Sequence, residues 1–146
     1  KPILQLGTLS DDLMRRDFTV NAMAMDMDGN IIDDWRGLQA LKQMTLRTPL
    51  DSMTTLMDDP LRLLRALRFS ITRGFRISQP LWDAMMQPGI LVKMKDVVSQ
   101  DRMRDEVTKM MAHDTVASLK LLSSIPGLLD VVFSDGLWLM PTSKKV

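Results

Sequence analysis

The chain has 146 residues, enough for one domain or two small packed lobes and for a core that folds without disulfides. It has no cysteine and a single histidine, His113, which excludes disulfide scaffolds, thiolate metal sites, cysteine nucleophiles and a histidine-based zinc site. The net charge is +1, but five arginines occur from Arg62 to Arg76 without an acidic residue. No apolar run is long enough to span a membrane, so we expect a soluble, cytoplasmic protein.

The first third of the chain is predicted to contain short strands. The acidic pair at 11–12 indicates the start of a helix. Apolar segments within 18–32 flank the turn signal Asp-Gly-Asn at 28–30, which predicts a β-hairpin. Residues 45–48 are predicted to form another short strand, closed by Pro49.

The remainder is predicted to be helical. The first helix opens at Pro60, after two aspartates, and ends at Gly74. Pro88-Gly89 is predicted to stop the second helix, and apolar residues recur at helical spacing in the third. The four predicted helices cover residues 61–72, 78–86, 99–113 and 115–124.

Candidate chemical groups have structural alternatives. Asp26 and Asp28 on one strand would share a face and suit metal ions, but Asp28 precedes Gly29 and favours a turn. The pair Asp33-Asp34 is open between loop and ligand, and His113 favours a role at a helix C-terminus. The arginine-rich helix is either a solvated face or a phosphate-binding surface. These patterns alone indicate a soluble α/β protein with an anion-binding arginine helix.

Longer sequence strings point to a family. The strings are LMRRDFTVNA at 13–22, IIDDWRGLQAL at 31–41, DDPLRLLRALRF at 58–69 and VSQDRMRDEV at 98–107. In this order they resemble the motifs of the class II tRNA nucleotidyltransferases, the CCA-adding enzymes, and of the related bacterial poly(A) polymerases. The resemblance covers residues 7–122.

The resemblance implies an α+β fold and an enzymatic function. Residues 1–50 would be the C-terminal part of a polymerase-β-type head domain with a short mixed sheet. Residues 51–146 would form an all-helical neck domain that selects nucleotides. The implied activity is addition or repair of the 3′-terminal CCA of tRNA from CTP and ATP, with Mg²⁺ and without a nucleic-acid template.

The resemblance also implies roles for single residues. Arg16, Asp17 and Asn21 would hold the ribose and phosphates of the incoming nucleotide. Asp59 and Arg62 would read its base, since cytosine and adenine both present an amino donor beside a ring-nitrogen acceptor. A carboxylate accepts from the amino group and a guanidinium donates to the ring nitrogen, whereas uracil and guanine present the reverse pattern.

Further positions follow from the same motifs. The resemblance implies that Arg65 and Arg68 line the same nucleotide pocket, and both follow Arg62 at helical spacing. Asp33 and Gly37 would belong to a flexible hinge between head and neck, where a glycine permits φ values that other residues resist.

The chain also departs from the family pattern. The metal-binding carboxylate pair of the family lies upstream of RRDFTVNA, so we expect Mg²⁺ to be bound mainly outside this chain and the chain alone to add no nucleotide. Ala40 replaces a usual aspartate near the hinge. Three interpretations remain: part of a complete enzyme, a half-enzyme working with a second chain that bears the carboxylates, or a non-catalytic nucleotide- or tRNA-binding subunit. Poly(A)-type tailing of RNA is the alternative chemistry.

Overall fold

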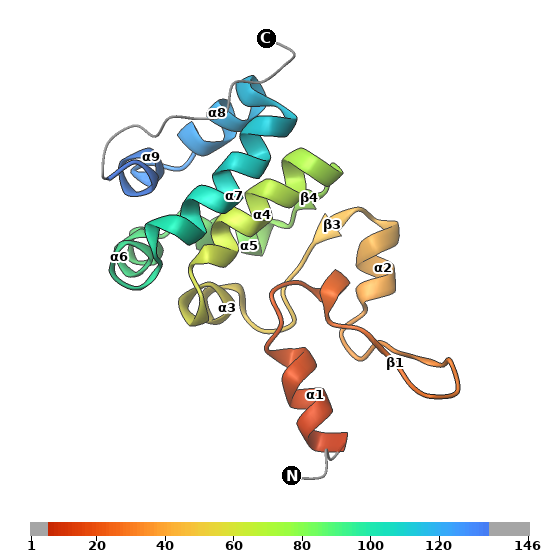
Figure 1. Cartoon of the computed structure of the whole chain (residues 1–146). Helices are drawn as coiled ribbons and strands as arrows, with labels where there is room; N and C mark the ends of the chain where they lie inside the picture. The colour runs from red at the N-terminus through yellow and green to blue at the C-terminus, as the bar shows by residue number, and fades with distance from the viewer. Residues whose placement is uncertain (1–5, 135–146) are drawn as a thin grey trace.

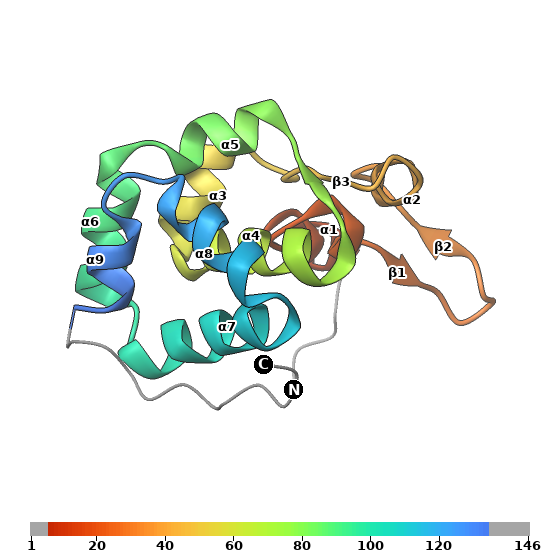
Figure 2. The same ribbon diagram turned by 90° about the horizontal axis from the view of Figure 1, so that it is seen from above.

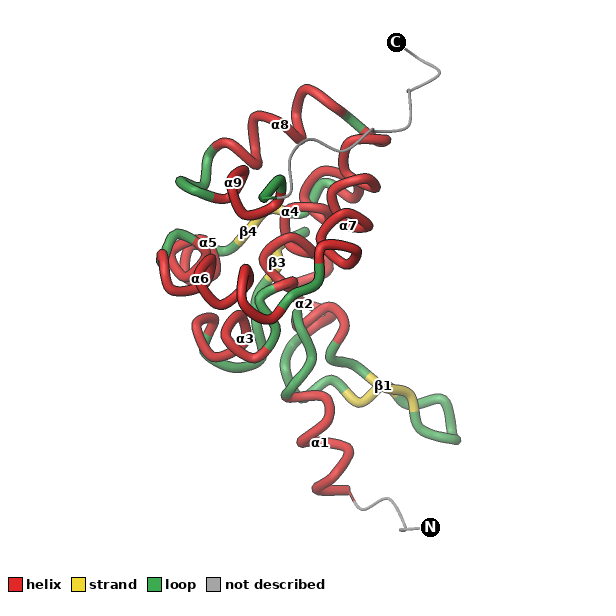
Figure 3. The backbone as a smooth tube through the Cα atoms, turned by 60° about the vertical axis from the view of Figure 1, so that its left-hand side comes forward, coloured by secondary structure: helices red, strands yellow, loops and turns green. Residues whose placement is uncertain are grey.

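A computed structural model describes residues 6–134, which form mostly helices with two small two-stranded sheets (Figures 1 and 3). No helix within 6–134 is both long enough and apolar enough to cross a membrane. The elements in chain order are α1 (Leu6–Met14), the 3₁₀ helix η1 (Thr19–Asn21), β1 (Ala24–Met25), β2 (Ile31–Ile32), α2 (Gly37–Lys42), β3 (Thr45–Leu46), α3 (Ser52–Asp58), α4 (Leu61–Arg73), β4 (Arg76–Ile77), α5 (Gln79–Met85), α6 (Pro88–Val97), α7 (Gln100–His113), α8 (Thr115–Ser123) and α9 (Leu128–Val132).

The predicted hairpin is present as the antiparallel pair β1–β2, which projects from the rest of the molecule (Figures 1 and 2). Asp26 Oδ1 accepts hydrogen bonds from the backbone N–H groups of Asp28 at 2.9 Å and Asn30 at 2.8 Å, and Gly29 takes a φ of 84°. The N–H of Asn30 is the main reason that the pKa of Asp26 lies below its ordinary value. The interpretation of Asp26 and Asp28 as turn residues is therefore confirmed.

The strand predicted at 45–48 is confirmed as the shorter β3, but its partner was not predicted. β3 pairs in parallel with β4, with Thr45 opposite Arg76 and Leu46 opposite Ile77. Helices α3 and α4 together form the crossover connection that a parallel pair requires.

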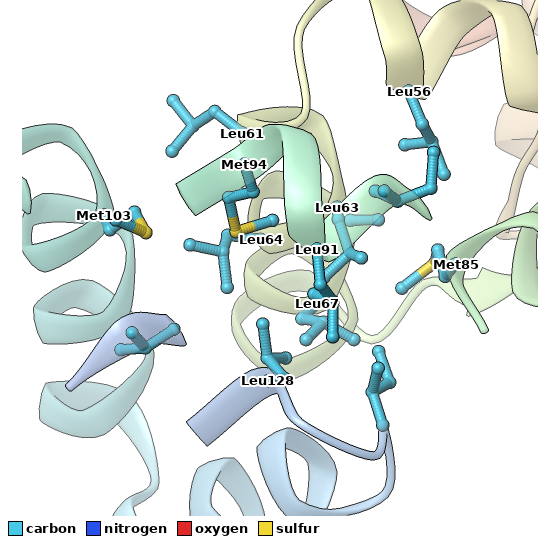
Figure 4. Close-up of a cluster of buried hydrophobic side chains, with 14 of the residues drawn as sticks. Leu56, Leu61, Leu63, Leu64, Leu67, Met85, Leu91, Met94, Met103 and Leu128 are labelled. Carbon is cyan, nitrogen blue, oxygen red and sulfur yellow. The ribbon is translucent and has the colours of Figure 1, made fainter. Parts of the chain in front are cut away.

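Helix α4 lies at the centre of the helical body and packs mainly against α7, while α3 packs against α5 (Figures 1 and 4). Its buried residues face a core shared with α5, α6, α7 and α9. These α4 residues are Leu61, Leu63, Leu64, Ala66 and Leu67. Each fully buried leucine removes enough apolar surface from water to contribute about 1.5–3 kcal/mol, so this helix anchors the helical body.

Local signals fix most helix ends. Helix α4 begins after Pro60 and ends at Gly74, whose φ of 73° is the left-handed conformation that glycine favours. Helix α7 begins after its N-cap Ser99, whose Oγ accepts from Arg102 N at 3.2 Å. The helices predicted at 61–72, 78–86, 99–113 and 115–124 are confirmed to within one or two residues.

Other expectations about helices were wrong. Helix α1 contains residues 11 and 12 in its second half, so the acidic pair does not begin it. Pro88 begins α6 rather than only stopping α5, because proline is tolerated in the first helical turn. Helices α3 and α9 were also not predicted.

Candidate functional site

A cavity of about 590 Å³ lies where the segment after α1 meets the first turns of α4 and α7. Four arginines and two aspartates line it, which gives the wall an excess of positive charge. It brings together six of the seven residues predicted to bind nucleotide, and Arg68 is not among the lining residues. The wall consists of Arg16, Asp17, Asn21, Asp59, Leu61, Arg62, Arg65, Phe69 and Arg102.

Asp17 is a buried carboxylate that holds several donors in place on one side of this cavity. Its Oδ1 accepts from the backbone N–H of Phe18 at 2.7 Å and from Asn21 Nδ2 at 3.1 Å. Its Oδ2 accepts from Arg65 Nε at 2.7 Å. With only 9% of its surface exposed, Asp17 ties the N-terminal segment to α4 and fixes the Arg65 guanidinium at the cavity wall.

Arg68 has a different role, because its guanidinium forms an ion pair with buried Glu106 of α7. Arg65 approaches the same carboxylate at 4.0 Å. Both guanidinium groups lie over the ring of Phe69, at 5.2 Å for Arg65 and 4.6 Å for Arg68. Arg68 therefore does not line the cavity, but it shares the contacts with Glu106 and Phe69 that hold Arg65 at the cavity wall.

Arg16 is a half-exposed donor at the cavity. It donates to the carbonyl of Asn21 at 3.3 Å and to Asp12 Oδ2 at 3.2 Å, and 47% of its side chain is exposed. A guanidinium has five donors, so the remaining ones are available to a ligand.

Asp59 and Arg62, the predicted base-reading pair, both line the cavity but bond to other groups. Asp59 Oδ1 accepts from Leu61 N at 3.2 Å, and its Oδ2 accepts from Arg102 at 3.0 Å. Arg62 donates to the backbone carbonyls of Thr55 at 3.0 Å and Arg15 at 2.8 Å. Those two carbonyls hold the Arg62 guanidinium in a fixed orientation.

Arg102, Phe69 and Glu106 are site residues that sequence reasoning did not single out. Arg102 lies three residues after the cap Ser99, in the first turn of α7, which points it toward the start of α4. The motif VSQDRMRDEV at 98–107 is part of the family resemblance, but it does not reveal that Arg102 pairs with Asp59.

The residues predicted as a hinge contact each other at the start of α2. Asp33 accepts from the N–H of Gly37 at 2.6 Å and of Leu38 at 3.1 Å, which caps the helix. A Cβ at Gly37 would lie 2.2 Å from the carbonyl oxygen of Thr19, so this position needs glycine for close approach. The left-handed residue is instead Arg36, with a φ of 60°. The hinge role itself stays a prediction.

A divalent cation does not fit the described residues. Within 6–134 no three acidic, histidine or cysteine side chains are grouped closely enough to hold a metal ion. Both carboxylates of the cavity, Asp17 and Asp59, already accept from guanidinium groups.

Known proteins share this sequence and fold. The profile of the Poly A polymerase head domain family matches residues 3–47. The chain is 35% identical over 134 residues to the mitochondrial CCA tRNA nucleotidyltransferase of Saccharomyces cerevisiae, covering 90% of this chain and 24% of that protein. It is 33% identical over 135 residues to the CCA-adding enzyme of Bacillus pumilus, covering 88% and 33%.

Solved structures agree with this similarity. The CCA-adding enzyme of Bacillus stearothermophilus in complex with CTP has a TM-score of 0.71 at 34% identity, covering 82% of this chain and 31% of that one. The CCA-adding enzyme of Thermotoga maritima complexed with tRNA has a TM-score of 0.77 at 26% identity, covering 92% and 33%.

The fold is therefore that of a nucleotidyltransferase, and the predicted class of a polymerase-β-type head followed by helices is confirmed. More closely, the chain is similar in sequence and fold to CCA tRNA nucleotidyltransferases, and its residues 3–47 match the head domain family of poly(A) polymerases. It spans about a quarter to a third of the length of the curated relatives it matches.

Proposed function

We propose that this chain is the nucleotide-selecting part of a tRNA nucleotidyltransferase that adds or repairs the 3′-terminal CCA of tRNA from CTP and ATP. The observation that carries the proposal is the cavity, which gathers four arginines with a carboxylate at its rim and six of the predicted residues. Relatives named CCA-adding enzymes, and solved structures of such enzymes with CTP and ATP, support it. Residues 1–50 as head and 51–146 as neck, Mg²⁺ held mainly by groups other than the cavity carboxylates, and a cytoplasmic location are parts of the same proposal.

Binding of the triphosphate is assigned to the side of the cavity organised by Asp17. Arg65 is fixed there with its Nε on Asp17, which leaves its other nitrogens as donors. Arg16 and Asn21 lie on the same wall. Phosphate oxygens accept several charge-assisted hydrogen bonds at once, so a cluster of guanidinium groups around one organising carboxylate suits a polyphosphate.

Base selection is assigned to Asp59 and Arg62 at the start of α4. Arg62 is oriented by two backbone carbonyls, and the donors that these carbonyls do not use are available to a ring nitrogen. The Asp59 carboxylate keeps lone pairs beyond its bonds to Leu61 and Arg102, and these accept from an exocyclic amino group. Uracil and guanine would present a carbonyl oxygen to the Asp59 carboxylate and a ring N–H to the Arg62 donors. Each group left unpaired in this way would cost about 1–3 kcal/mol.

Poly(A)-type tailing is the second candidate, because the head profile that matches residues 3–47 is named for poly(A) polymerases. The two chemistries differ in their nucleotides. A tailing site needs ATP alone, whereas CCA addition requires CTP and ATP at one site.

The test is calorimetric binding of CTP, ATP, UTP and GTP to the wild-type chain, Asp59→Ala and Asp58→Ala. Asp58 is the matched control, since it is the adjacent carboxylate and lines a different cavity. We expect the wild type and Asp58→Ala to prefer CTP and ATP. Asp59→Ala should weaken both about tenfold, because one hydrogen bond of about 1–3 kcal/mol is lost, and should leave UTP and GTP as weak as before.

The other possible results of this titration each bear on one part of the proposal. Binding of ATP without CTP favours tailing. An unchanged preference in Asp59→Ala removes its base-reading role and leaves it as the acceptor of Leu61 N. Failure of the wild-type chain to bind any nucleotide contradicts the proposal.

A further inference from the structure

A second cavity, of about 300 Å³, lies beside α2, between η1 and the end of β3. Figure 1 shows α2 next to β3 on the side of the molecule away from α6 and α9. The backbone N–H of Thr19 donates to the carbonyl of Arg47 at 2.8 Å, which joins η1 to the chain after β3 along this cavity. None of its lining residues is shared with the candidate nucleotide site.

Two residues of its wall carry buried donors without a partner. Among residues 6–134, Thr19 Oγ1 and Trp35 Nε1 are two of only a few buried side-chain polar atoms that lack a hydrogen bond. Thr19 is 4% exposed, so its hydroxyl has little access to bulk water. Buried polar groups are nearly always paired, and an indole N–H can only donate. The missing partner of Trp35 is therefore an acceptor.

The charge of the wall indicates what kind of acceptor. Arg36 and Arg47 both line the cavity, and no acidic residue does. The Arg47 guanidinium donates to Gln43 Oε1 at 3.4 Å, which uses one of its five donors. A wall with two arginines, two unpaired neutral donors and no acidic residue favours an oxyanion over a neutral acceptor or a cation.

The backbone at Arg36 gives a second indication. Arg36 has a φ of 60° and a ψ of 40°, the left-handed conformation that is unfavourable for a residue with a Cβ. Glycine would adopt this conformation without strain. Arginine therefore occupies this position at a cost in backbone energy, and the residue lines the cavity.

From these observations we infer that the α2 cavity is a binding site for a phosphate group, held by the Thr19 hydroxyl, the Trp35 indole N–H and the guanidinium groups of Arg36 and Arg47. The inference does not rest on the proposed function, because it uses none of the residues of the nucleotide cavity. A phosphate presents oxygens to several donors at once, and both the free ion and a phosphodiester of RNA have this chemistry.

The test uses the indole N–H resonance of Trp35 in ¹H–¹⁵N spectra of the full chain, which has three tryptophans. Trp35→Phe assigns the resonance by its loss. Inorganic phosphate is titrated at constant ionic strength against chloride, and the dinucleotide CpC is titrated as a carrier of one phosphodiester. We expect a saturable downfield shift of the Trp35 resonance with phosphate, with CpC or with both. The ligand that produces it identifies the source of the phosphate group.

Variants separate a binding site from a structural role. Arg36→Gly and Thr19→Val should each weaken the response at least tenfold, yet melt at or above the wild-type temperature without phosphate, because strain or an unpaired hydroxyl has been removed. Lys42→Ala removes the same charge from α2 outside the cavity and should respond like the wild type. Arg102→Ala, in the nucleotide cavity, should also leave the Trp35 response unchanged.

Three results would overturn the inference. The first is that chloride shifts the Trp35 resonance as much as phosphate does. The second is that neither phosphate nor CpC shifts it, as expected for a cavity filled only by water. The third is that Arg36→Gly and Thr19→Val respond with wild-type affinity. If one of these variants lost nucleotide binding, that result would concern the proposed function and not the phosphate site, because the two cavities share no lining residue.

Discussion

The arginines of the proposed nucleotide cavity differ in how firmly each guanidinium is held. Arg62 is fixed by two backbone carbonyls, and Arg65 by the buried carboxylate of Asp17. Arg16 and Arg102 have about half of their side-chain surface exposed and bond to exposed or partly exposed acids. The first pair is preorganised, whereas the second pair can exchange its present partners for a ligand at little cost, since exposed ion pairs contribute at most about 1 kcal/mol.

This difference gives a prediction for Arg16→Lys. Lysine keeps the charge but cannot form two parallel hydrogen bonds, so CTP and ATP should both bind at least about tenfold more weakly, from a loss of about 1.5–3 kcal/mol. The free energy of unfolding should change by less than about 0.5 kcal/mol, because the side chain is half exposed. Calorimetric titration and urea unfolding measure the two effects. Unchanged nucleotide affinity would show that Arg16 only contacts Asn21 and Asp12.

Asp26 provides a prediction about pH at the hairpin turn. The N–H of Asn30 lowers the pKa of this carboxyl in the folded chain, so the unfolded chain binds the proton more readily. The stabilisation of the turn is complete above the unfolded pKa of about 3.9 and is lost as the pH falls through the lower folded value. Carboxyl ¹³C shifts of Asp26 and the amide shift of Asn30 should titrate together. In Asp26→Asn the Asn30 amide should lose this step, and a pKa at or above the ordinary value would contradict the assignment.

At the scale of elements, the sequence predicts those whose signals are local. The ends of α4 follow from Pro60 and Gly74, and the β1–β2 hairpin follows from the turn around Gly29. β4 was not predicted because its two residues become a strand only by pairing with β3, which lies far along the chain. The same reason applies to the site. The motifs identified Asp59, but its partner Arg102 belongs to another helix that only tertiary packing brings near.

Helix α2 shows how one residue fixes the approach of two elements. In Gly37→Ala the added Cβ would meet the carbonyl oxygen of Thr19 at 2.2 Å, and backbone cannot move aside without displacing η1. We expect a loss of about 3 kcal/mol or more in the free energy of unfolding, beyond the usual range for overpacking, because the obstacle is backbone. Gly89→Ala in α6 is the control. Its Cβ meets nothing within 4 Å, so the substitution should stabilise the chain by up to about 1 kcal/mol.

Urea unfolding distinguishes these two expectations by the sign of the change. A mild effect of Gly37→Ala would show that α2 moves relative to η1 at low cost. That outcome would favour the predicted hinge at Asp33 and Gly37 over a rigid junction.

Over the whole molecule, one buried polar network joins the N-terminal segment to the helical body. It runs from Asp17 through Arg65 to Glu106 and Arg68, and therefore links the segment after α1 with α4 and α7. Phe69 lies beneath both guanidinium groups and packs edge-on against Phe18, with ring centres 5.9 Å apart. The position of Arg65 in the proposed nucleotide cavity thus depends partly on Glu106, a carboxylate that does not line the cavity.

Glu106→Gln tests this dependence. Glu106 is 4% exposed and faces two guanidinium groups, so removing its charge leaves buried cations partly uncompensated. Breaking a buried pair in this way costs about 3–5 kcal/mol, which urea unfolding would measure. Where the variant still folds, CTP and ATP should bind more weakly, because Arg65 loses the support that orients it.

Asp105→Asn is the matched control, since Asp105 precedes Glu106 on the same helix and pairs with Lys109 at 3.0 Å on the exposed surface. We expect that control to change the free energy of unfolding by no more than about 0.5 kcal/mol and to leave nucleotide binding intact. Equal effects of the two substitutions would show that the network contributes only surface electrostatics and does not position Arg65.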